Sequence, residues 1–89
     1  SRREGKHHMP DAMQVHAADT VAVALRPLQA GEQVSLGKST SLVVEDIPQG
    51  HKFALKAHEA DERVVKYGLP IGRASAAIAP GAHVHSHNL

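Results

Sequence analysis

The stretch "LQAGEQV" (residues 28–34) sets out a turn that the chain uses three times. It recurs as "IPQGHKF" (47–53) and "IAPGAHV" (78–84): an aliphatic residue, two residues, Gly, two residues and a large apolar residue. Glycine readily adopts the left-handed conformation of a tight turn, while the flanking apolar residues hold both arms to a core. "AHEADERV" repeats the pattern loosely, with Asp61 in the glycine position. The repeat predicts a compact all-β domain of short strands and Gly turns.

Short β-prone segments lie between these turns, rich in β-branched residues and bounded by turn signals. We expect a hairpin around Gly37 and further turns at "PQG", "EADE" and "LPIG". "HEADERVVKY" and "RASAAIA" also contain good helix formers, so a helical alternative stays open there. The expected strands are "QVHA" (14–17), "TVAVAL" (20–25), "QVSL" (33–36), "TSLVVEDI" (40–47), "HKFALKA" (51–57), "RVVKYG" (63–68) and "ASAAIA" (74–79).

The composition limits the classes of protein to consider. Eighty-nine residues make one domain, whose core must be mostly aliphatic because the chain has one Phe, one Tyr and no Trp. Without cysteine there are no disulfides and no thiolate metal sites. We expect residues 1–13 to be a flexible leader or a cloning remnant, and residues 14–89 to be the folded domain. No apolar run approaches the roughly 20 residues of a membrane span, so we expect a cytoplasmic protein without a membrane partner.

The charges are balanced, with a formal net charge of +1. No basic stripe occurs, and the chain offers almost no aromatic surface for base stacking. Nucleic acid is therefore not an expected partner. Short strands with unpaired edges favour self-association into a homo-oligomer, although the oligomeric state stays open.

The last seven residues, "HVHSHNL", hold three histidines spaced two apart. In an extended strand His83, His85 and His87 would project from one face. Imidazole is the commonest metal ligand and a natural proton carrier near neutral pH, so the row is a candidate metal or substrate site. The alternative is a solvated edge strand with no function, and the spacing alone leaves both interpretations open.

Two further segments carry candidate polar groups. In "GHKFAL", Lys52 could hold a carboxylate while His51 moves a proton, or the segment could be a hairpin with an ordinary surface lysine. In "VVKYGLPIGRA", a loop with two glycines would present Lys66, Tyr67 and Arg73 to a ligand, or those glycines could serve ordinary turns.

Taken together, "VHAADTVAVAL", "IPQGHKFAL", "VVKYGLPIGRA" and "HVHSHN" resemble the N-terminal domain of altronate and galactarate dehydratases. That module is a SAF domain with a β-clip fold, and its family includes small subunits such as the sulfolactate sulfo-lyase alpha chain. The resemblance covers residues 15–88, and its four motifs occur in the right order. The "KYGLPIG" and "HVHSHN" segments are most similar to the altronate type.

The resemblance implies a role in eliminating water from a sugar acid to give a 2-keto-3-deoxy acid, with a divalent metal, typically iron(II). It implies that His51, Lys52 and His85 act as catalytic groups, and that the histidine row 83, 85 and 87 supplies metal ligands. Lys66, Tyr67, Arg73 and His16 are the expected substrate-binding residues. Which sugar acid is the substrate stays open.

Family enzymes join this module to a much larger domain, so the resemblance also implies a large catalytic dehydratase domain or subunit as partner. We therefore expect the chain to be a separate small subunit or a fragment, inactive by itself. The alternative is a non-catalytic SAF module that binds carbohydrate, since SAF domains also occur in pilus-assembly chaperones and in ice-binding or sialic-acid-related proteins. Such a module should bind sugar alone, whereas a dehydratase component should need its partner for turnover.

Overall fold

The computed structural model describes residues 10–14, 16–66, 68–85 and 87–89, and within these ranges it contains short strands and turns but no helix. This confirms the all-β prediction. A four-stranded antiparallel sheet has the order β1-β2-β5-β8, and β3–β4 and β6–β7 form separate hairpins. The strands are β1 (Ala12–Met13), β2 (Val21–Ala24), β3 (Gln33–Ser35), β4 (Thr40–Leu42), β5 (Lys52–Ala54), β6 (Arg63–Lys66), β7 (Leu69–Arg73) and β8 (His83–Val84).

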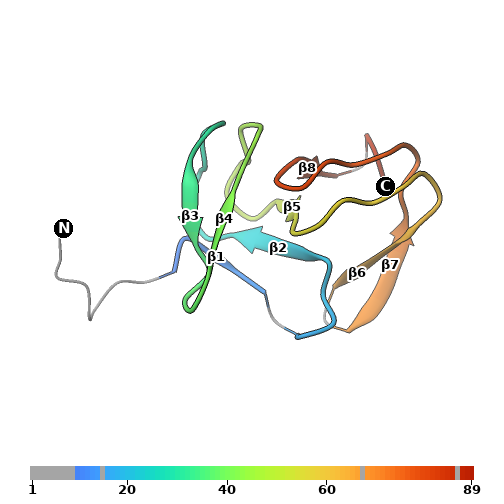
Figure 1. Ribbon diagram of the computed structural model, residues 1–89, viewed down its shortest axis with the longest axis horizontal. Helices are drawn as coiled ribbons and strands as arrows, with labels where there is room; N and C mark the ends of the chain where they lie inside the picture. Colours follow the sequence, from blue (N-terminus) through green and yellow to red (C-terminus); the bar gives the residue numbers. More distant parts are fainter. Residues whose placement is uncertain (1–9, 15, 67, 86) are drawn as a thin grey trace, which may run out of the picture.

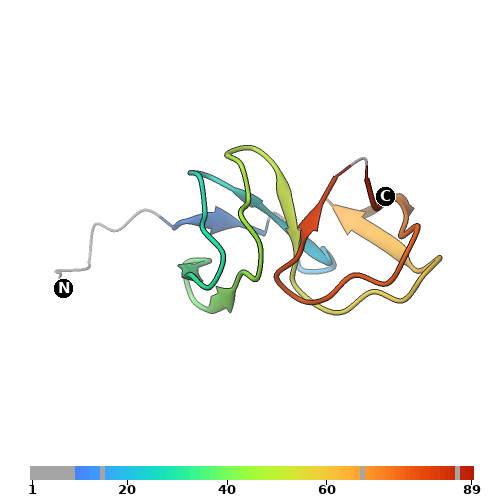
Figure 2. The same cartoon turned by 90° about the horizontal axis from the view of Figure 1, so that it is seen from above.

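The two hairpins lie on opposite sides of the central sheet, with β3–β4 on the left and β6–β7 on the right of the view in Figure 1. Figure 2 shows the same separation from above. Each side has its own apolar cluster, one around Phe53 and Leu28 and the other around Val64 and Ile78. The sheet contributes to both clusters, since Phe53 belongs to the first and its neighbour Ala54 to the second. This follows from the alternation of side chains along a strand.

The repeated turn predicted from the sequence is present at all four places. Gly31, Gly50 and Gly81 have φ values of 86°, 83° and 81°, and Asp61 has a φ of 73° in the equivalent position. The residues that open the turns pair through isolated β-bridges. In the first half of the chain the bridge joins Leu28 to Ile47. In the second half the corresponding bridge joins His58 to Ile78, so a buried histidine stands where the other repeats have an aliphatic residue.

The hairpin around Gly37 is confirmed, with Gln33, Val34 and Ser35 paired to Leu42, Ser41 and Thr40. The expected strand at residues 14–17 is wrong. His16 instead opens a turn, in which its N–H donates to the Asp19 carboxylate and its carbonyl accepts the Asp19 N–H. Such a local side-chain bond gives the backbone an alternative to a sheet ladder.

Two predictions near the C-terminal half are also wrong. "LPIG" is part of strand β7 rather than a turn, because the reversal of direction occurs at Gly68, with a φ of 76°. Pro70 is tolerated because it lies in a two-stranded hairpin, next to a register shift between Val64 and Val65. "ASAAIA" forms no strand, apart from the bridge at Ile78. Small alanine side chains have little surface with which to stabilise a pleated strand.

The folded region includes residues before Gln14, the expected start of the domain. Ala12 is fully buried and pairs with Ala24, while Met13 pairs with Val23. The Asp11 carboxylate anchors this strand, since it accepts the Ser35 N–H at 2.7 Å and pairs with Arg26 at 3.1 Å. In the described part of the chain no helix is long and apolar enough to cross a membrane.

Candidate histidine site

Strands β5 and β8 bring three histidines to the same face of the sheet. Their register pairs Lys52 with Val84 and Phe53 with His83. Because side chains alternate along each strand, His51 lies on the Phe53 side of β5, and His85 lies on the His83 side of β8. The Gly50 turn, whose N–H donates to the Ala24 carbonyl, fixes where His51 enters the sheet.

The three rings stack closely on one another. His51 Nδ1 lies 2.9 Å from His83 Nε2, within hydrogen-bonding distance. The ring centroids of His51 and His85 are 4.2 Å apart with a 17° angle between the planes, and those of His83 and His85 are 5.6 Å apart. One nitrogen from each of the three residues lies within 4.8 Å of the other two. We call His51, His83 and His85 the histidine cluster.

The sequence predicted that His87 continues a row along one strand with His83 and His85. In the structure His87 lies beside the cluster but outside strand β8. Strand β8 ends at Val84, and His87 and Asn88 lie in a turn. The Asn88 side chain makes this turn, since its Oδ1 accepts the His85 N–H at 3.0 Å and its Nδ2 donates to the His83 carbonyl at 2.7 Å. The His87 ring is tilted by 40° to the His83 ring, with centroids 5.2 Å apart.

Two members of the cluster, His83 and His85, have lowered pKa values. Partial burial is the main cause that lowers the pKa of His83, and the nearby His51, His87 and His85 lower it further. Glu45 opposes this shift, and its carboxylate also accepts the His83 backbone N–H at 3.3 Å. The pKa of His85 is lowered by desolvation first and then by His51. A neutral imidazole has a free nitrogen lone pair, which is the form that binds metals and accepts protons.

The donor set of the cluster fits a first-row divalent metal. Three imidazoles converge, and nitrogen ligands suit iron(II), zinc and their neighbours better than magnesium or calcium. The expected ligand set of His83, His85 and His87 differs from this cluster in one member, because the structure places His51 rather than His87 with the other two.

Lys52 is next to His51 in sequence but projects to the other face of the sheet, on the side of Val84. Its pKa is lowered by burial first and by Lys66 second. The positive charge of Lys52 also contributes to lowering the pKa of His85. Lys52 therefore lies near enough to influence the cluster electrostatically without being part of it.

The other expected site residues are dispersed. The His16 ring lies against the β6–β7 turn, where a Cβ added to Gly68 would be 3.0 Å from it. Arg73 lies at the far end of β7, where its Nη1 donates to the Asp61 carbonyl at 3.0 Å. No hydrogen bond or ring contact joins either residue to the cluster in the described part of the chain. Tyr67 lies outside the described residues.

Comparisons with known proteins identify the family of this chain. The sequence-family model described as the altronate/galactarate dehydratase SAF domain matches residues 10–89. The chain belongs to this SAF domain family. Altronate dehydratase of Escherichia coli (strain K12) is 50% identical over 76 residues, which are 85% of this chain and 15% of that enzyme. Altronate dehydratase of Bacillus subtilis (strain 168) is 41% identical over 80 residues, 90% of this chain and 16% of the enzyme.

A third relative is similar in length to this chain. The alpha subunit of (2R)-sulfolactate sulfo-lyase from Chromohalobacter salexigens is 36% identical over 83 residues, 84% of this chain and 88% of that subunit. The chain thus spans about one sixth of the altronate dehydratases that it matches, but most of a protein named as a subunit.

Sequence reasoning missed two residues that contact the histidine cluster and one buried histidine elsewhere in the SAF domain. The Asn88 side chain accepts the His85 N–H, and the Glu45 carboxylate accepts the His83 N–H. His58 is buried and forms a bridge with Ile78, a member of the second apolar cluster. The only available signal was the position of His58 in the repeat, where an aliphatic residue was expected. Glu45 and Asn88 acquire their roles only through tertiary pairing.

Proposed function

We propose that this chain is the SAF component of a sugar-acid dehydratase, and that its histidine cluster forms part of a metal-assisted site completed by a larger catalytic domain or subunit. The convergence of His51, His83 and His85 carries this proposal. Membership of the family supports it, as do the altronate dehydratases in which the matching region is a small fraction of the enzyme. The cytoplasmic location expected from the sequence stays part of the proposal.

Dehydration of a sugar acid requires removal of the proton beside the carboxylate and loss of the hydroxyl group on the next carbon. A base must take the proton, and the negative charge that develops on the carboxylate must be stabilised. His51, His83 and His85 would hold the divalent metal, iron(II) in our expectation. When bound, such a metal acts as a Lewis acid on a carboxylate or hydroxyl oxygen.

The chain's own residues prepare this site in two ways. The lowered pKa values of His83 and His85 keep their nitrogens unprotonated near neutral pH, so protons compete less for them. The Asn88 turn fixes the backbone of His83 and His85 through both of its side-chain polar atoms. Lys52 projects to the opposite face of the sheet, so its expected role in holding the substrate carboxylate stays a prediction.

A partner is part of the proposal because, among the described residues, few groups near the cluster could bind the rest of a sugar acid. Glu45 is the carboxylate that contacts it, and only through the His83 backbone. We therefore expect the chain to be inactive alone and to complete the site of the larger polypeptide. Substrate contacts by Lys66, Arg73, Tyr67 and His16 stay predictions.

The test is reconstitution of activity with the large dehydratase polypeptide from the same source. Altronate and galactarate would be supplied with iron(II), with and without this chain, and formation of the 2-keto-3-deoxy acid measured. We expect turnover to require the chain, and to fall at least tenfold, or about 1.4 kcal/mol of transition-state stabilisation, with His83→Ala or His85→Ala. Turnover that does not depend on the chain would exclude the proposal and favour a carbohydrate-binding module.

A further inference from the structure

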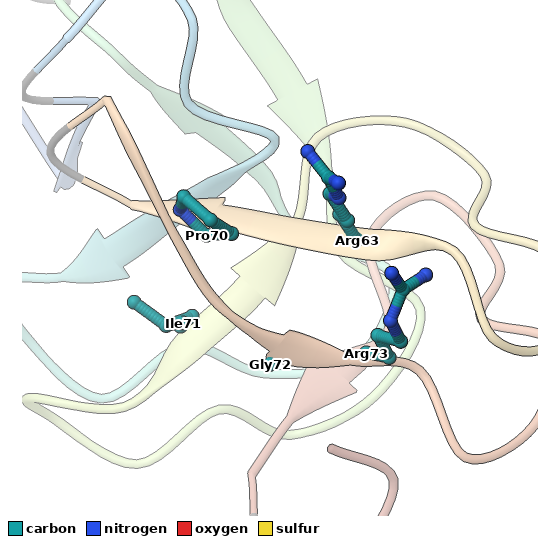
Figure 3. A pocket seen from close by; sticks show the side chains of 5 residues that line it. All are labelled: Arg63, Pro70, Ile71, Gly72 and Arg73. Atoms are coloured by element: carbon teal, nitrogen blue, oxygen red, sulfur yellow. The ribbon is translucent and has the colours of Figure 1, made fainter.

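A pocket on the β6–β7 hairpin carries two arginines from neighbouring strands. It is lined by Arg63, Pro70, Ile71, Gly72 and Arg73. Arg63 and Arg73 are direct partners in the antiparallel register, so both side chains project from the same face of the hairpin. In Figure 3 their guanidinium groups extend to the same side, with Pro70 and Ile71 further along the hairpin.

This face points away from the core. The neighbouring pair, Val64 and Gly72, occupies the opposite face, where Val64 is fully buried and Leu89 packs against Gly72. Arg63, Arg73 and Ile71 are all exposed. The pocket is therefore open to a ligand from solvent, and the C-terminal residue fills the other side of the hairpin.

Two like charges directly opposite each other destabilise a strand pair unless something neutralises them. Within the described residues, neither Arg63 nor Arg73 makes an ion pair with a carboxylate. Arg73 is held in place by the bond from its Nη1 to the Asp61 carbonyl, which leaves its other N–H donors free. The arrangement offers several N–H donors and two positive charges to one anion.

We propose that Arg63 and Arg73 form a binding site for the carboxylate of a small organic acid, separate from the histidine cluster. The planar guanidinium fork matches a carboxylate in bidentate geometry. Pro70 and Ile71 add apolar surface beside the charges, which suits the carbon skeleton of an organic acid better than an inorganic oxyanion. The proposal concerns binding by this chain alone and does not depend on its assignment to a dehydratase.

The test is a titration of the ¹⁵N-labelled chain with succinate at low ionic strength, followed through the Nε–Hε signals of the arginines in NMR spectra. Low salt matters because exposed charges are strongly screened. We expect the signals of Arg63 and Arg73 to shift together along one saturating curve. Arg63→Gln and Arg73→Gln should each weaken binding at least fivefold, and the double variant should be little worse than either, because one anion uses both groups.

Lys38→Gln is the matched control, since Lys38 is an exposed basic residue on the other hairpin and its loss should leave succinate binding unchanged. Inorganic phosphate at equal ionic strength is the competing ligand, and we expect it to bind more weakly than succinate. Phosphate binding as tight as succinate would overturn the assignment to an organic acid. Equal effects of Lys38→Gln and the arginine variants would reduce the site to general attraction between charges.

Discussion

His51 Nδ1 lies 2.9 Å from His83 Nε2, although the two residues are 32 positions apart in the chain. At this distance one ring nitrogen donates and the other accepts, so the pair holds a single proton between the two facing atoms. The contact exists because β5 pairs with β8, and His85 stacks on His51 from the same strand end. The pairing of two short strands thus converts scattered histidines into one site.

The contact should be visible in the titration of His83. Burial and the neighbouring imidazoles lower its pKa, so we expect its midpoint below the value of about 6.5 for a free imidazole. His51→Ala should move the pKa of His83 upward, because it removes a neighbouring positive charge at low pH and opens the site to water. Ring proton shifts in NMR spectra measure this directly. A midpoint of His83 that is the same in both proteins would contradict the coupling.

The buried His58 should make the fold sensitive to acid. It is 1% exposed, its Nε2 lies 2.8 Å from Thr20 Oγ1, and burial lowers its pKa. The folded state therefore binds a proton less readily than the unfolded state, whose histidine pKa is about 6.5. The stabilisation from neutral His58 is complete above that pH and is lost as the pH falls toward the folded-state pKa.

His58→Leu should accordingly flatten the loss of stability below about pH 6.5, since leucine does not titrate and Leu28 holds the equivalent place in the first repeat. Urea unfolding at a series of pH values measures the slope. His87→Ala is the control, because it removes an exposed histidine instead of a buried one. If His58→Leu kept the wild-type slope, the buried imidazole would not be the source of acid sensitivity.

Gly81 and Gly31 offer a matched pair for the repeated turn. Both have a positive φ, but a Cβ at Gly81 would overlap the Leu42 carbonyl oxygen, whereas a Cβ at Gly31 would meet nothing within 4 Å. Gly31→Ala should cost about 1–2 kcal/mol from the left-handed conformation alone. Gly81→Ala should cost at least about 2 kcal/mol more, because backbone must move. Equal losses in chemical unfolding would show that the close approach to Leu42 is unimportant.

Asp61 provides the reverse substitution. It is the non-glycine member of the four turns, with a φ of 73°. Asp61→Gly should stabilise the fold by up to about 1 kcal/mol, because glycine adopts this conformation without a steric penalty. The backbone carbonyl that Arg73 binds is retained in this variant. Thermal and urea unfolding would measure the gain, and a loss of stability would mean that the Asp61 side chain contributes more than its conformation costs.

The repeated turns were the part of the fold most accessible to sequence reasoning. A glycine between apolar residues is a local signal, and the same four positions adopt positive φ in the structure. The strand at Leu69–Arg73 was missed because Pro70 and Gly72 are typical turn residues, and they are tolerated here by a two-stranded hairpin with a register shift. Strand β1 was missed because a strand of two residues is too short to show an alternation of apolar and polar side chains.

Part of the grouping of the histidines was predictable from the sequence. The row of histidines near the C-terminus is visible in the sequence, and His83 and His85 do lie together. His51 was singled out by its neighbours "GHKF", but its position against His83 depends on the β5–β8 register, which a single sequence does not contain. His87 was placed in the row by assuming a straight strand, and the Asn88 side chain ends that strand early.

The proposed function requires that His51, His83 and His85 act as one metal-binding unit. The most direct measurement is a titration of the chain with cobalt(II), followed by the visible absorption of the bound ion. We predict one bound ion per chain, with affinity lowered at least tenfold, about 1.4 kcal/mol, by His51→Ala, His83→Ala or His85→Ala, and much less by His87→Ala. Wild-type affinity in the three cluster variants, or a loss confined to His87→Ala, would contradict the claim.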